Sequence, residues 1–287
     1  MLATQRQDHI LAEVRATGAV RVADLVAQLD VSDMTVRRDI AELARAGQVR
    51  RVHGGAVAPH ATGLAADETG FAAKRTWAAA EKSAIARAAL TTIEPGQSIA
   101  LSGGTTTHLL AQLIAASPQL RPLTVVTNSL PVADVLHHAS APGTAVAVGP
   151  LEVILTGGVR TPSDALVGPV ADAALARLRV DQVLLGVHGL DAAGATTPNL
   201  LEAATDEALI GCAGRLTVLA DHTKWGVVGL ARIVLLEDVD LLISDDALPG
   251  DARTVLERAV GHLLLAPADP TAAAPPSRTP HPTEDPR

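Results

Sequence analysis

The chain has 287 residues, of which 48% are apolar, so it can form one small and one large domain with a sizeable buried core. Aromatic residues make up only 1%, which argues against a protein that binds single-stranded nucleic acid on aromatic stacking surfaces. The formal net charge is -8, but residues 1–57 hold eight Arg and no Lys against seven Asp or Glu. The excess of acidic residues therefore lies in the rest of the chain, and it does not exclude a local contact between residues 1–57 and DNA.

Residues 1–57 are predicted to form three short helices and a β-hairpin wing. The third helix is expected to start at a cap provided by Ser32 or Asp33 and to end before Gly47, a suitable helix stop. Two short extended runs around Gly54-Gly55 predict the hairpin. Apolar residues recur at helical spacing in the three helices: Ile10, Leu11 and Val14, then Val22, Leu25, Val26 and Leu29, then Val36, Ile40 and Leu43.

The exposed side of the third predicted helix carries candidate DNA contacts. The first residues of such a helix can enter the major groove, where Thr and Arg reach base edges or phosphates, while the wing meets the adjacent backbone. Paired arginines also commonly solvate a helix face, but these follow a helix-turn pattern and precede a basic hairpin. The candidate DNA-binding residues are Ser32, Thr35, Arg37, Arg38, Arg50, Arg51 and His53.

Residues 58–76 show little periodicity and are predicted to be a linker. Residues 77–265 then alternate short apolar strands with amphipathic helices, which predicts a mainly parallel sheet covered by helices. Residues 266–287 hold seven prolines and are predicted to be a disordered tail. Strands are expected at 98–102, 123–127, 183–187, 216–220, 233–236 and 241–244, with one ending at 156–158, and helices at 81–91, 106–116, 169–179, 199–213 and after Pro131.

A loop rich in Gly and Thr, from Ser102 to Thr107, lies between a predicted strand and a predicted helix. Its backbone N–H groups, its hydroxyls and the helix dipole favour an anion, although the loop by itself is equally compatible with a plain tight turn. It lacks the Gly-Lys-Ser/Thr of a Walker motif and the Gly-x-Gly-x-x-Gly spacing of a dinucleotide fingerprint.

The run VSDMTVRRDI at 31–40, followed by RVHGGA at 51–56, resembles the helix-turn-helix signature of the DeoR family of bacterial regulators. The resemblance extends to about residue 246. It implies an α/β protein in which a winged helix-turn-helix is joined to a Rossmann-like sensor domain related in fold to ribose-5-phosphate isomerases. Most members of that family repress sugar or polyol catabolic genes until a phosphorylated intermediate binds.

The resemblance also implies an effector pocket. The loop matches the family's Gly-Thr-Thr phosphate loop, although Leu101-Ser102-Gly103 stands where the family more often has an acidic residue. Further polar residues follow successive predicted strands, whose carboxyl ends bind ligands in such sheets. Each of these residues taken alone also has a purely structural explanation, because an Asp after a strand usually forms a turn or caps a helix. The candidate effector-binding residues are Gly104, Thr105, Thr106, Thr107, Asn128, Gly158, His188, Asp191, Asp221 and Lys224.

The expected partners are double-stranded operator DNA and a phosphorylated sugar or polyol, with the chain acting as a homo-oligomer, dimer or tetramer, because helix-turn-helix proteins usually read paired half-sites. Two alternatives remain open. A sugar-phosphate isomerase-like enzyme fused to a DNA-binding module could use Asp221 and Lys224 as acid–base groups, but fold alone does not establish catalysis. An architectural DNA binder without a sensor is disfavoured by the polar residues at the strand ends.

Composition also indicates the compartment. The single cysteine, Cys212, has no thiol partner for an internal disulfide or a zinc cluster, which is typical of the reducing cytoplasm. The N-terminus lacks the apolar run of a signal peptide, and no run of about 18 apolar residues predicts a membrane span. The ten histidines show no metal-ligand spacing. We therefore expect a cytoplasmic location, no membrane partner, no metal and no cofactor.

Overall fold

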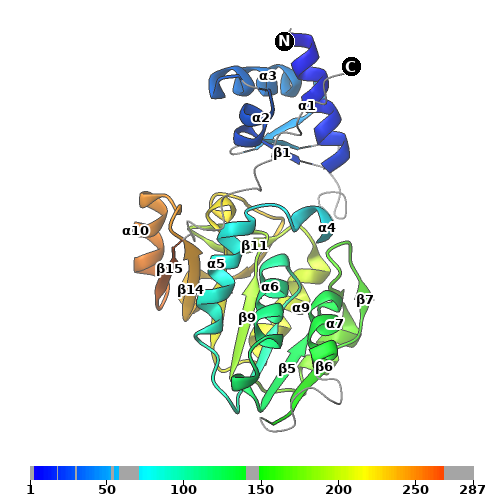
Figure 1. Cartoon of the computed structure of the whole chain (residues 1–287), viewed down its shortest axis with the longest axis vertical. Coiled ribbons are helices and arrows are strands. Elements are labelled where there is room, and N and C mark those ends of the chain that lie inside the picture. The colour runs from blue at the N-terminus through cyan, green and yellow to red at the C-terminus, as the bar shows by residue number, and fades with distance from the viewer. Residues whose placement is uncertain are drawn as a thin grey trace, which may run out of the picture.

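The computed structural model describes residues 3–17, 19–29, 31–52, 55–57, 71–139 and 149–267. Figure 1 shows a small N-terminal unit of helices and short strands, and a larger unit in which helices cover a sheet. This architecture confirms the predicted fold class, a winged helix-turn-helix followed by a mainly parallel α/β domain. Within the described ranges, no helix is long and apolar enough to cross a membrane.

The N-terminal unit combines three helices with an antiparallel sheet in the order β1-β3-β2. Its elements are α1 (Ala3–Thr17), β1 (Ala19–Arg21), α2 (Val22–Leu29), α3 (Asp33–Arg45), β2 (Arg50–Val52) and β3 (Gly55–Val57). The sequence predicts all of them except β1. A strand of three residues is too short to show an alternating pattern, so only its pairing with β3 reveals it.

Helix α3 is oriented by the apolar residues that the sequence assigns to its inner side. Val36, Ile40 and Leu43 are buried in one cluster with apolar residues of α1 and α2. Asp39 is also buried, and its carboxylate accepts a hydrogen bond of 2.7 Å from Nε of Arg6 in α1. Because the inner side is fixed in this way, the start of α3 presents its other side to solvent.

Local hydrogen bonds fix the two ends of α3. At its start the Ser32 hydroxyl accepts a hydrogen bond of 3.3 Å from the backbone N–H of Thr35, which makes Ser32 the N-cap. At its end Gly47 adopts a left-handed φ of 68°, and its N–H donates to the Ala44 carbonyl at 3.0 Å. A glycine in this conformation is a common way to stop a helix, so both predicted end signals are confirmed.

The larger unit is built on seven parallel strands in the order β15-β14-β12-β9-β4-β5-β6. These strands are β4 (Ser98–Leu101), β5 (Leu123–Thr127), β6 (Leu151–Leu155), β9 (Gln182–Gly186), β12 (Leu216–Leu219), β14 (Leu241–Asp245) and β15 (Leu263–Ala266). The chain adds strands outward from β4 on one side and from β9 on the other, so the order reverses between these two neighbours. Ligands of such sheets bind outside the carboxyl ends of the strands at this switch point.

Helices cover both faces of the parallel sheet (Figure 1). They are α5 (Ala79–Leu90), α6 (Thr105–Ala115), α7 (Leu130–Ala139), α8 (Pro169–Leu175), α9 (Leu200–Gly211) and α10 (Gly250–Ala259). Alternate strand residues point to opposite faces. Leu101 and Leu184 belong to the apolar cluster with α5, α6 and α7, whereas Ala100 and Val183 belong to the cluster with α8, α9 and α10. Both faces are therefore buried, as the apolar strands predict.

One predicted strand lies outside the parallel sheet. The strand expected at 233–236 is β13 (Ala231–Val234), which pairs antiparallel with β11 (Gly194–Thr197) in a small sheet that also contains β10 (Gly189–Asp191). The hairpin of β10 and β11 is not predicted from the sequence, and neither is a further hairpin that joins β7 (Val159–Arg160) to β8 (Leu166–Val167). These strands have two to four residues, so pairing rather than sequence pattern defines them.

The C-terminal part of the larger unit also extends beyond the prediction. Neither α10 nor β15 is predicted, because a short apolar run such as Leu263–Ala266 does not by itself distinguish a strand from a helix. Ala266, the first residue of the predicted tail, ends β15 and is buried, whereas residues 268–287 lie outside the described residues. Ala266 therefore belongs to the sheet.

The predicted linker ends in a short helix, α4 (Phe71–Lys74), while residues 58–70 lie outside the described part of the chain. The backbone N–H of Phe71 donates to the Pro162 carbonyl at 3.2 Å. Its ring packs edge-on against the His108 ring, with the ring centres 5.4 Å apart. The single Phe of the chain thus attaches the last part of the predicted linker to the larger unit.

Candidate functional site

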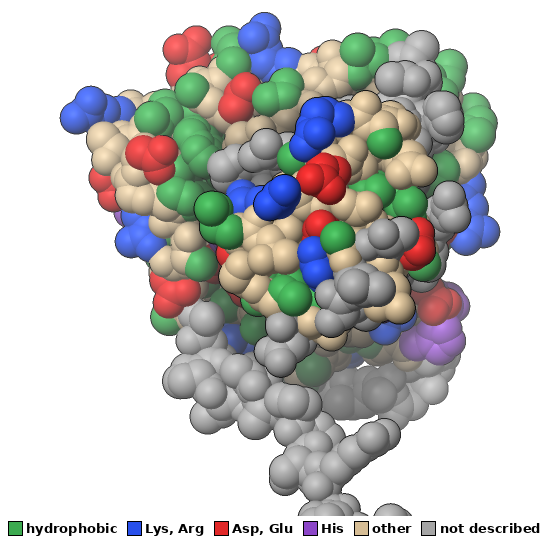
Figure 2. Space-filling view, turned by 90° about the horizontal axis from the view of Figure 1, so that it is seen from above, with side chains coloured by type: hydrophobic (Ala, Val, Ile, Leu, Met, Phe, Trp, Pro, Cys, Tyr) green, Lys and Arg blue, Asp and Glu red, His purple; other side chains and the backbone are tan. Residues whose placement is uncertain are grey.

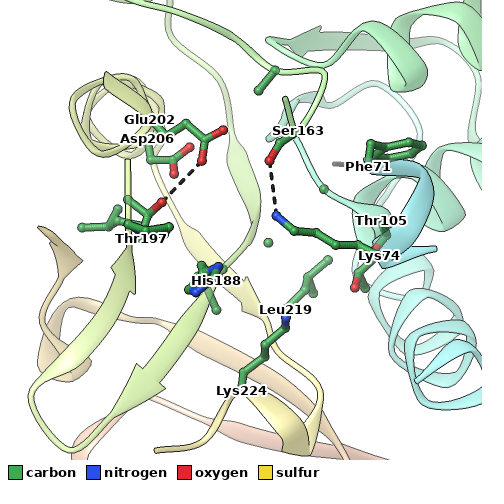
Figure 3. A pocket seen from close by; sticks show the side chains of 18 of the residues that line it. Phe71, Lys74, Thr105, Ser163, His188, Thr197, Glu202, Asp206, Leu219 and Lys224 are labelled. Atoms are coloured by element: carbon green, nitrogen blue, oxygen red, sulfur yellow. Dashed lines mark hydrogen bonds between the residues drawn. The ribbon is translucent and has the colours of Figure 1, made fainter. Parts of the chain in front are cut away.

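A pocket opens at the carboxyl ends of β4 and β9, where the order of the parallel strands reverses (Figure 3). Its lining comes from residues 103–106 after β4, residues 186–188 after β9, the helices α4, α5 and α9, and the turn after β12, among others. More than half of the lining residues are polar, and they include three Lys and three Asp or Glu. The pocket is therefore suited to a small charged ligand.

The Gly- and Thr-rich loop forms one side of this pocket. Gly103 must be a glycine, because a Cβ atom there would lie 2.7 Å from the Cβ of Ala165. Its N–H donates to Oδ1 of Asn128 at 2.9 Å, and the buried Thr107 hydroxyl donates to the Ser102 carbonyl at 2.8 Å. The loop is thus held rigidly from two sides. The first N–H groups of α6 have no partner within the helix, so this end of the pocket attracts an anion.

Three lysines from three different elements also line the pocket: Lys74 of α4, Lys82 of α5 and Lys224 after β12. Nζ of Lys74 donates to the Ser163 hydroxyl at 3.3 Å, and Nζ of the buried Lys82 donates to the Lys74 carbonyl at 2.9 Å. These are the only lysines of the chain, whose other basic residues are Arg or His. All three lysines of the protein therefore line the same pocket.

The turn that carries Lys224 is held by two acidic side chains. The backbone N–H of Thr223 donates to Oδ1 of Asp221 at 3.1 Å, which caps the short 3-10 helix from His222 to Lys224. The ring of His222 lies 2.8 Å from Oδ2 of Asp245 at the end of β14. This carboxylate raises the pKa of His222. The turn is therefore tied to the sheet, and Lys224 extends from it toward the pocket (Figure 3).

An acidic wall, formed by the side chains of Glu202 and Asp206, lines the pocket from α9. Residues four apart in a helix share a face, so both carboxyl groups reach the same side of the pocket. Oε1 of Glu202 accepts a hydrogen bond of 3.0 Å from the Thr161 hydroxyl, and Oε2 accepts one of 3.4 Å from Thr197. Figure 3 shows the acidic wall on the side of the pocket away from Thr105.

Asp206 is unusual in its electrostatics. Burial in the pocket wall raises the pKa of its carboxyl well above the ordinary value, and the nearby charges of Glu202 and Glu207 raise it further. Helix α9 contains no basic residue that could offset this repulsion. The acidic wall is therefore an electrostatically costly arrangement that a bound cationic or proton-donating group would relieve.

The structure brings seven of the ten predicted effector-binding residues together around the pocket. They are Gly104, Thr105, Thr106, Asn128, His188, Asp221 and Lys224. The side-chain amide of Asn128 is buried and is used within the protein, since its Nδ2 also donates to the Leu166 carbonyl at 3.2 Å. It therefore shapes the loop.

The other three predicted residues, Thr107, Gly158 and Asp191, do not line the pocket. Thr107 is fully buried beneath the loop. Gly158 lies at the start of the β7–β8 hairpin, where a Cβ atom would be 2.7 Å from the Val167 carbonyl oxygen. Oδ1 of Asp191 accepts a hydrogen bond of 2.9 Å from the Ala193 N–H in the turn between β10 and β11. All three have local structural partners.

The sequence analysis did not single out several residues of the lining, in particular Phe71, Lys74, Lys82, Glu202 and Asp206. Two signals could have found the charged residues among them. The first is the scarcity of lysine in a chain that otherwise uses Arg, and the second is a like-charge pair on α9 without a basic neighbour. Neither signal depends on a known motif.

The candidate DNA-binding face lies at the start of α3. The side chains of Arg37 and Arg38 are exposed, each beside an acidic residue of the same helix: Arg37 contacts Asp33, and Nε of Arg38 lies 3.5 Å from Oε1 of Glu42. Seen from the end of the molecule shown in Figure 2, basic side chains alternate with acidic and apolar ones. Arg50 and Arg51 lie in β2, but their side chains, and all of His53, are outside the described residues.

Comparison with known proteins identifies both units. Residues 6–62 match the DeoR-like helix-turn-helix domain, and residues 77–246 match the DeoR C-terminal sensor domain. Three relatives are similar over most of their length. The HTH-type transcriptional regulator GlpR of Haloferax volcanii is 33% identical over 90% of this chain and 96% of its own length. The HTH-type transcriptional regulator YgbI of Escherichia coli K12 is 32% identical over 93% of this chain and 99% of its own length, and the lactose phosphotransferase system repressor of Staphylococcus aureus N315 is 32% identical over 84% of this chain and 91% of its own length.

The similar solved structures are more distant. Ribose 5-phosphate isomerase A from Neisseria gonorrhoeae is 12% identical, with a TM-score of 0.34 over 52% of this chain and 54% of that chain. The delta subunit of eIF2B from Chaetomium thermophilum is 17% identical, with a TM-score of 0.35 over 53% of this chain and 51% of that chain. Similarity at this level carries no argument about activity.

Proposed function

The chain belongs to the DeoR family of transcriptional regulators, and we propose that it represses genes of sugar or polyol metabolism until a phosphorylated sugar or polyol binds its larger unit. The family models together match most of the chain, and the relatives named above are regulators of transcription. One of them is by name a repressor of a lactose phosphotransferase system.

The N-terminal unit supplies the DNA contact in this proposal. Helix α3 enters the major groove with Thr35, Arg37 and Arg38 at its start, and Ser32 holds that start in place as the N-cap. Arginine can bind base edges or phosphates through its forked guanidinium group. Arg50, Arg51 and His53 of the wing would contact the adjacent backbone.

The observation that carries the sensor half of the proposal is the convergence of every lysine on the loop at the switch point. An ammonium group is a compact point charge, and a phosphate at a helix start is stabilised by such charges together with backbone N–H groups. Gly104, Thr105, Thr106 and Lys224 supply both kinds of donor to the pocket. Asp221 acts by positioning Lys224, and His188 lines the pocket after β9.

A thermal-shift screen of the full chain against inorganic phosphate and a panel of sugar and polyol phosphates tests this proposal. A ligand that binds only the native state at 100 times its dissociation constant adds about 2.7 kcal/mol to the free energy of unfolding. At least one phosphate ester should raise the melting temperature, and the unphosphorylated sugar should not. If no phosphate compound raises it, the sensor half of the proposal is wrong.

We further propose that the pocket binds its ligand without turning it over, and that the protein acts in the cytoplasm as a dimer or tetramer. Incubation with pentose and hexose phosphates should then yield no isomer, and light scattering should give a mass above that of one chain.

The predicted domain boundaries at residues 57, 76 and 265 stay a prediction, which limited proteolysis checks.

A further inference from the structure

The pocket has two sides of opposite charge. On one side, Lys74 and the loop after β4 favour an anion, with Lys82 hydrogen-bonded to the Lys74 carbonyl and Lys224 reaching in from below (Figure 3). On the other side, the acidic wall of Glu202 and Asp206 faces the same space from α9 (Figure 3). A pocket built only to hold a phosphate would gain nothing from these two carboxyl groups, because they repel the anion that the lysines attract.

The two members of the acidic wall differ in their partners. Glu202 is oriented by the hydroxyls of Thr161 and Thr197. No hydrogen bond or ion pair of the Asp206 carboxyl is found within the described part of the chain. Asp206 is nevertheless half-buried beside Glu202. Its position therefore costs free energy in the empty protein, and a ligand can recover this cost.

The charges of the lining indicate which ligand does so. Its three lysines are matched by three acidic residues, Glu202, Asp206 and Asp221. A bound phosphate ester brings roughly two further negative charges. With the acidic residues ionised, the phosphate of a sugar without an amino group would leave the pocket with an excess of negative charge. A hydroxyl donor would satisfy one carboxyl oxygen, whereas an ammonium group can donate to both carboxyl groups and favours the ionised form of Asp206.

We propose that the pocket selects a phosphate ester that also carries a protonated amino group, as in an amino-sugar phosphate. The lysine side holds the phosphate, and the acidic wall holds the ammonium group between Glu202 and Asp206. This inference rests on the proposed function and deepens it, because it names the chemistry that distinguishes this ligand from other sugar phosphates.

Calorimetric titration of the full chain with matched ligands tests the inference. The ligands are inorganic phosphate and two pairs that differ only in the amino group: glucosamine 6-phosphate against glucose 6-phosphate, and galactosamine 6-phosphate against galactose 6-phosphate. In at least one pair the amino compound should bind about tenfold or more tightly, because a new opposite charge beside a carboxylate contributes at least this much.

Variants of α9 locate the effect. Asp206→Asn and Glu202→Gln should each reduce the preference for the amino compound to about threefold or less, while the affinity for inorganic phosphate is kept or increased. Glu257→Gln is the control, since Glu257 is exposed on α10 and does not line the pocket. It should keep the wild-type preference.

The outcomes separate this inference from the proposed function. If the neutral sugar phosphates bind as tightly as their amino partners, or if only inorganic phosphate binds, the inference is wrong and the phosphate site stands. If Glu257→Gln lowers the preference as much as Asp206→Asn, the acidic wall is not the selective element. If neither inorganic phosphate nor any ester binds, the proposed function fails and the inference fails with it.

Discussion

The two units of this protein use their basic residues in opposite ways. The N-terminal segment has eight Arg and no Lys, and the arginines at the start of α3 are exposed. Among the described residues, the pocket of the larger unit is lined by all three lysines and by no arginine, and Lys82 is buried. Arginine presents a flat fork suited to base edges and phosphates, whereas lysine presents a compact charge. Arginine in the DNA-binding unit and lysine in the pocket carry the same charge, so the choice between them reflects the shape of the group that each unit is expected to bind.

The largest effect is expected on the DNA side. The double variant Arg37→Ala, Arg38→Ala should weaken operator binding by the loss of two contacts, each of about 1–3 kcal/mol. A fluorescence anisotropy titration with an operator selected by the protein from random duplexes measures this. Arg258→Ala, which changes an exposed arginine in α10, is the control and should bind like wild type. Wild-type affinity in the double variant would refute the assignment of α3.

The next effect concerns the pocket. Lys224→Ala should leave operator affinity unchanged and abolish most of the ligand-induced stabilisation, about 2.7 kcal/mol at 100 times the dissociation constant. Lys224→Arg separates the effect of charge from the effect of shape, because a guanidinium group keeps the positive charge but not the compact shape of the ammonium group. This variant should restore only part of the ligand-induced rise in melting temperature. A thermal-shift titration measures both. A Lys224→Ala protein that responds like wild type would mean that the phosphate lies elsewhere.

A smaller effect is expected on stability and its pH dependence. The pKa of Asp206 is raised in the folded protein, so its ionisation costs no stability below the unfolded pKa and an increasing amount as pH rises through the folded pKa. Asp206→Asn should therefore raise the melting temperature at neutral pH, with the gain disappearing toward pH 4. Glu207→Gln should show a smaller gain. If Asp206→Asn lowers the melting temperature at neutral pH, the carboxyl has a stabilising partner.

The smallest effect is expected at the C-terminus. Removal of residues 268–287 should leave the melting temperature unchanged, because this Pro-rich segment has few apolar groups to offset the entropy of ordering. Removal from residue 263 onward should lower it, because β15 pairs with β14 through the parallel register of Leu263 and Leu242. Differential scanning calorimetry distinguishes the two truncations, and a loss of stability in the shorter truncation would show that the tail packs on the body.

The sequence predicts those features that depend on local signals. The ends of α3 follow from Ser32 and Gly47, and the loop at 102–107 follows from its place between a strand and a helix. Lys224 follows a predicted strand end, and the family resemblance implies its place in the pocket. Each of these features is contained within a few consecutive residues.

The features that the sequence analysis missed depend on packing between distant segments. Lys74 reaches the pocket because α4 docks beside Pro162, and the acidic wall reaches it because α9 packs against β11 and β13. In the sequence, Glu202 and Asp206 look like the solvated side of an amphipathic helix. Only the tertiary fold shows that they face three lysines.

A repressor that releases its operator on binding a ligand must couple the pocket to the DNA-binding unit. The most direct measurement is the operator affinity of the full chain with and without the tightest-binding sugar phosphate of the screen, together with the affinity for that phosphate with and without operator. We predict that the ligand weakens operator binding by about 5- to 150-fold and that operator weakens ligand binding by the same factor. A ligand that binds the pocket tightly but leaves operator affinity unchanged would contradict the account.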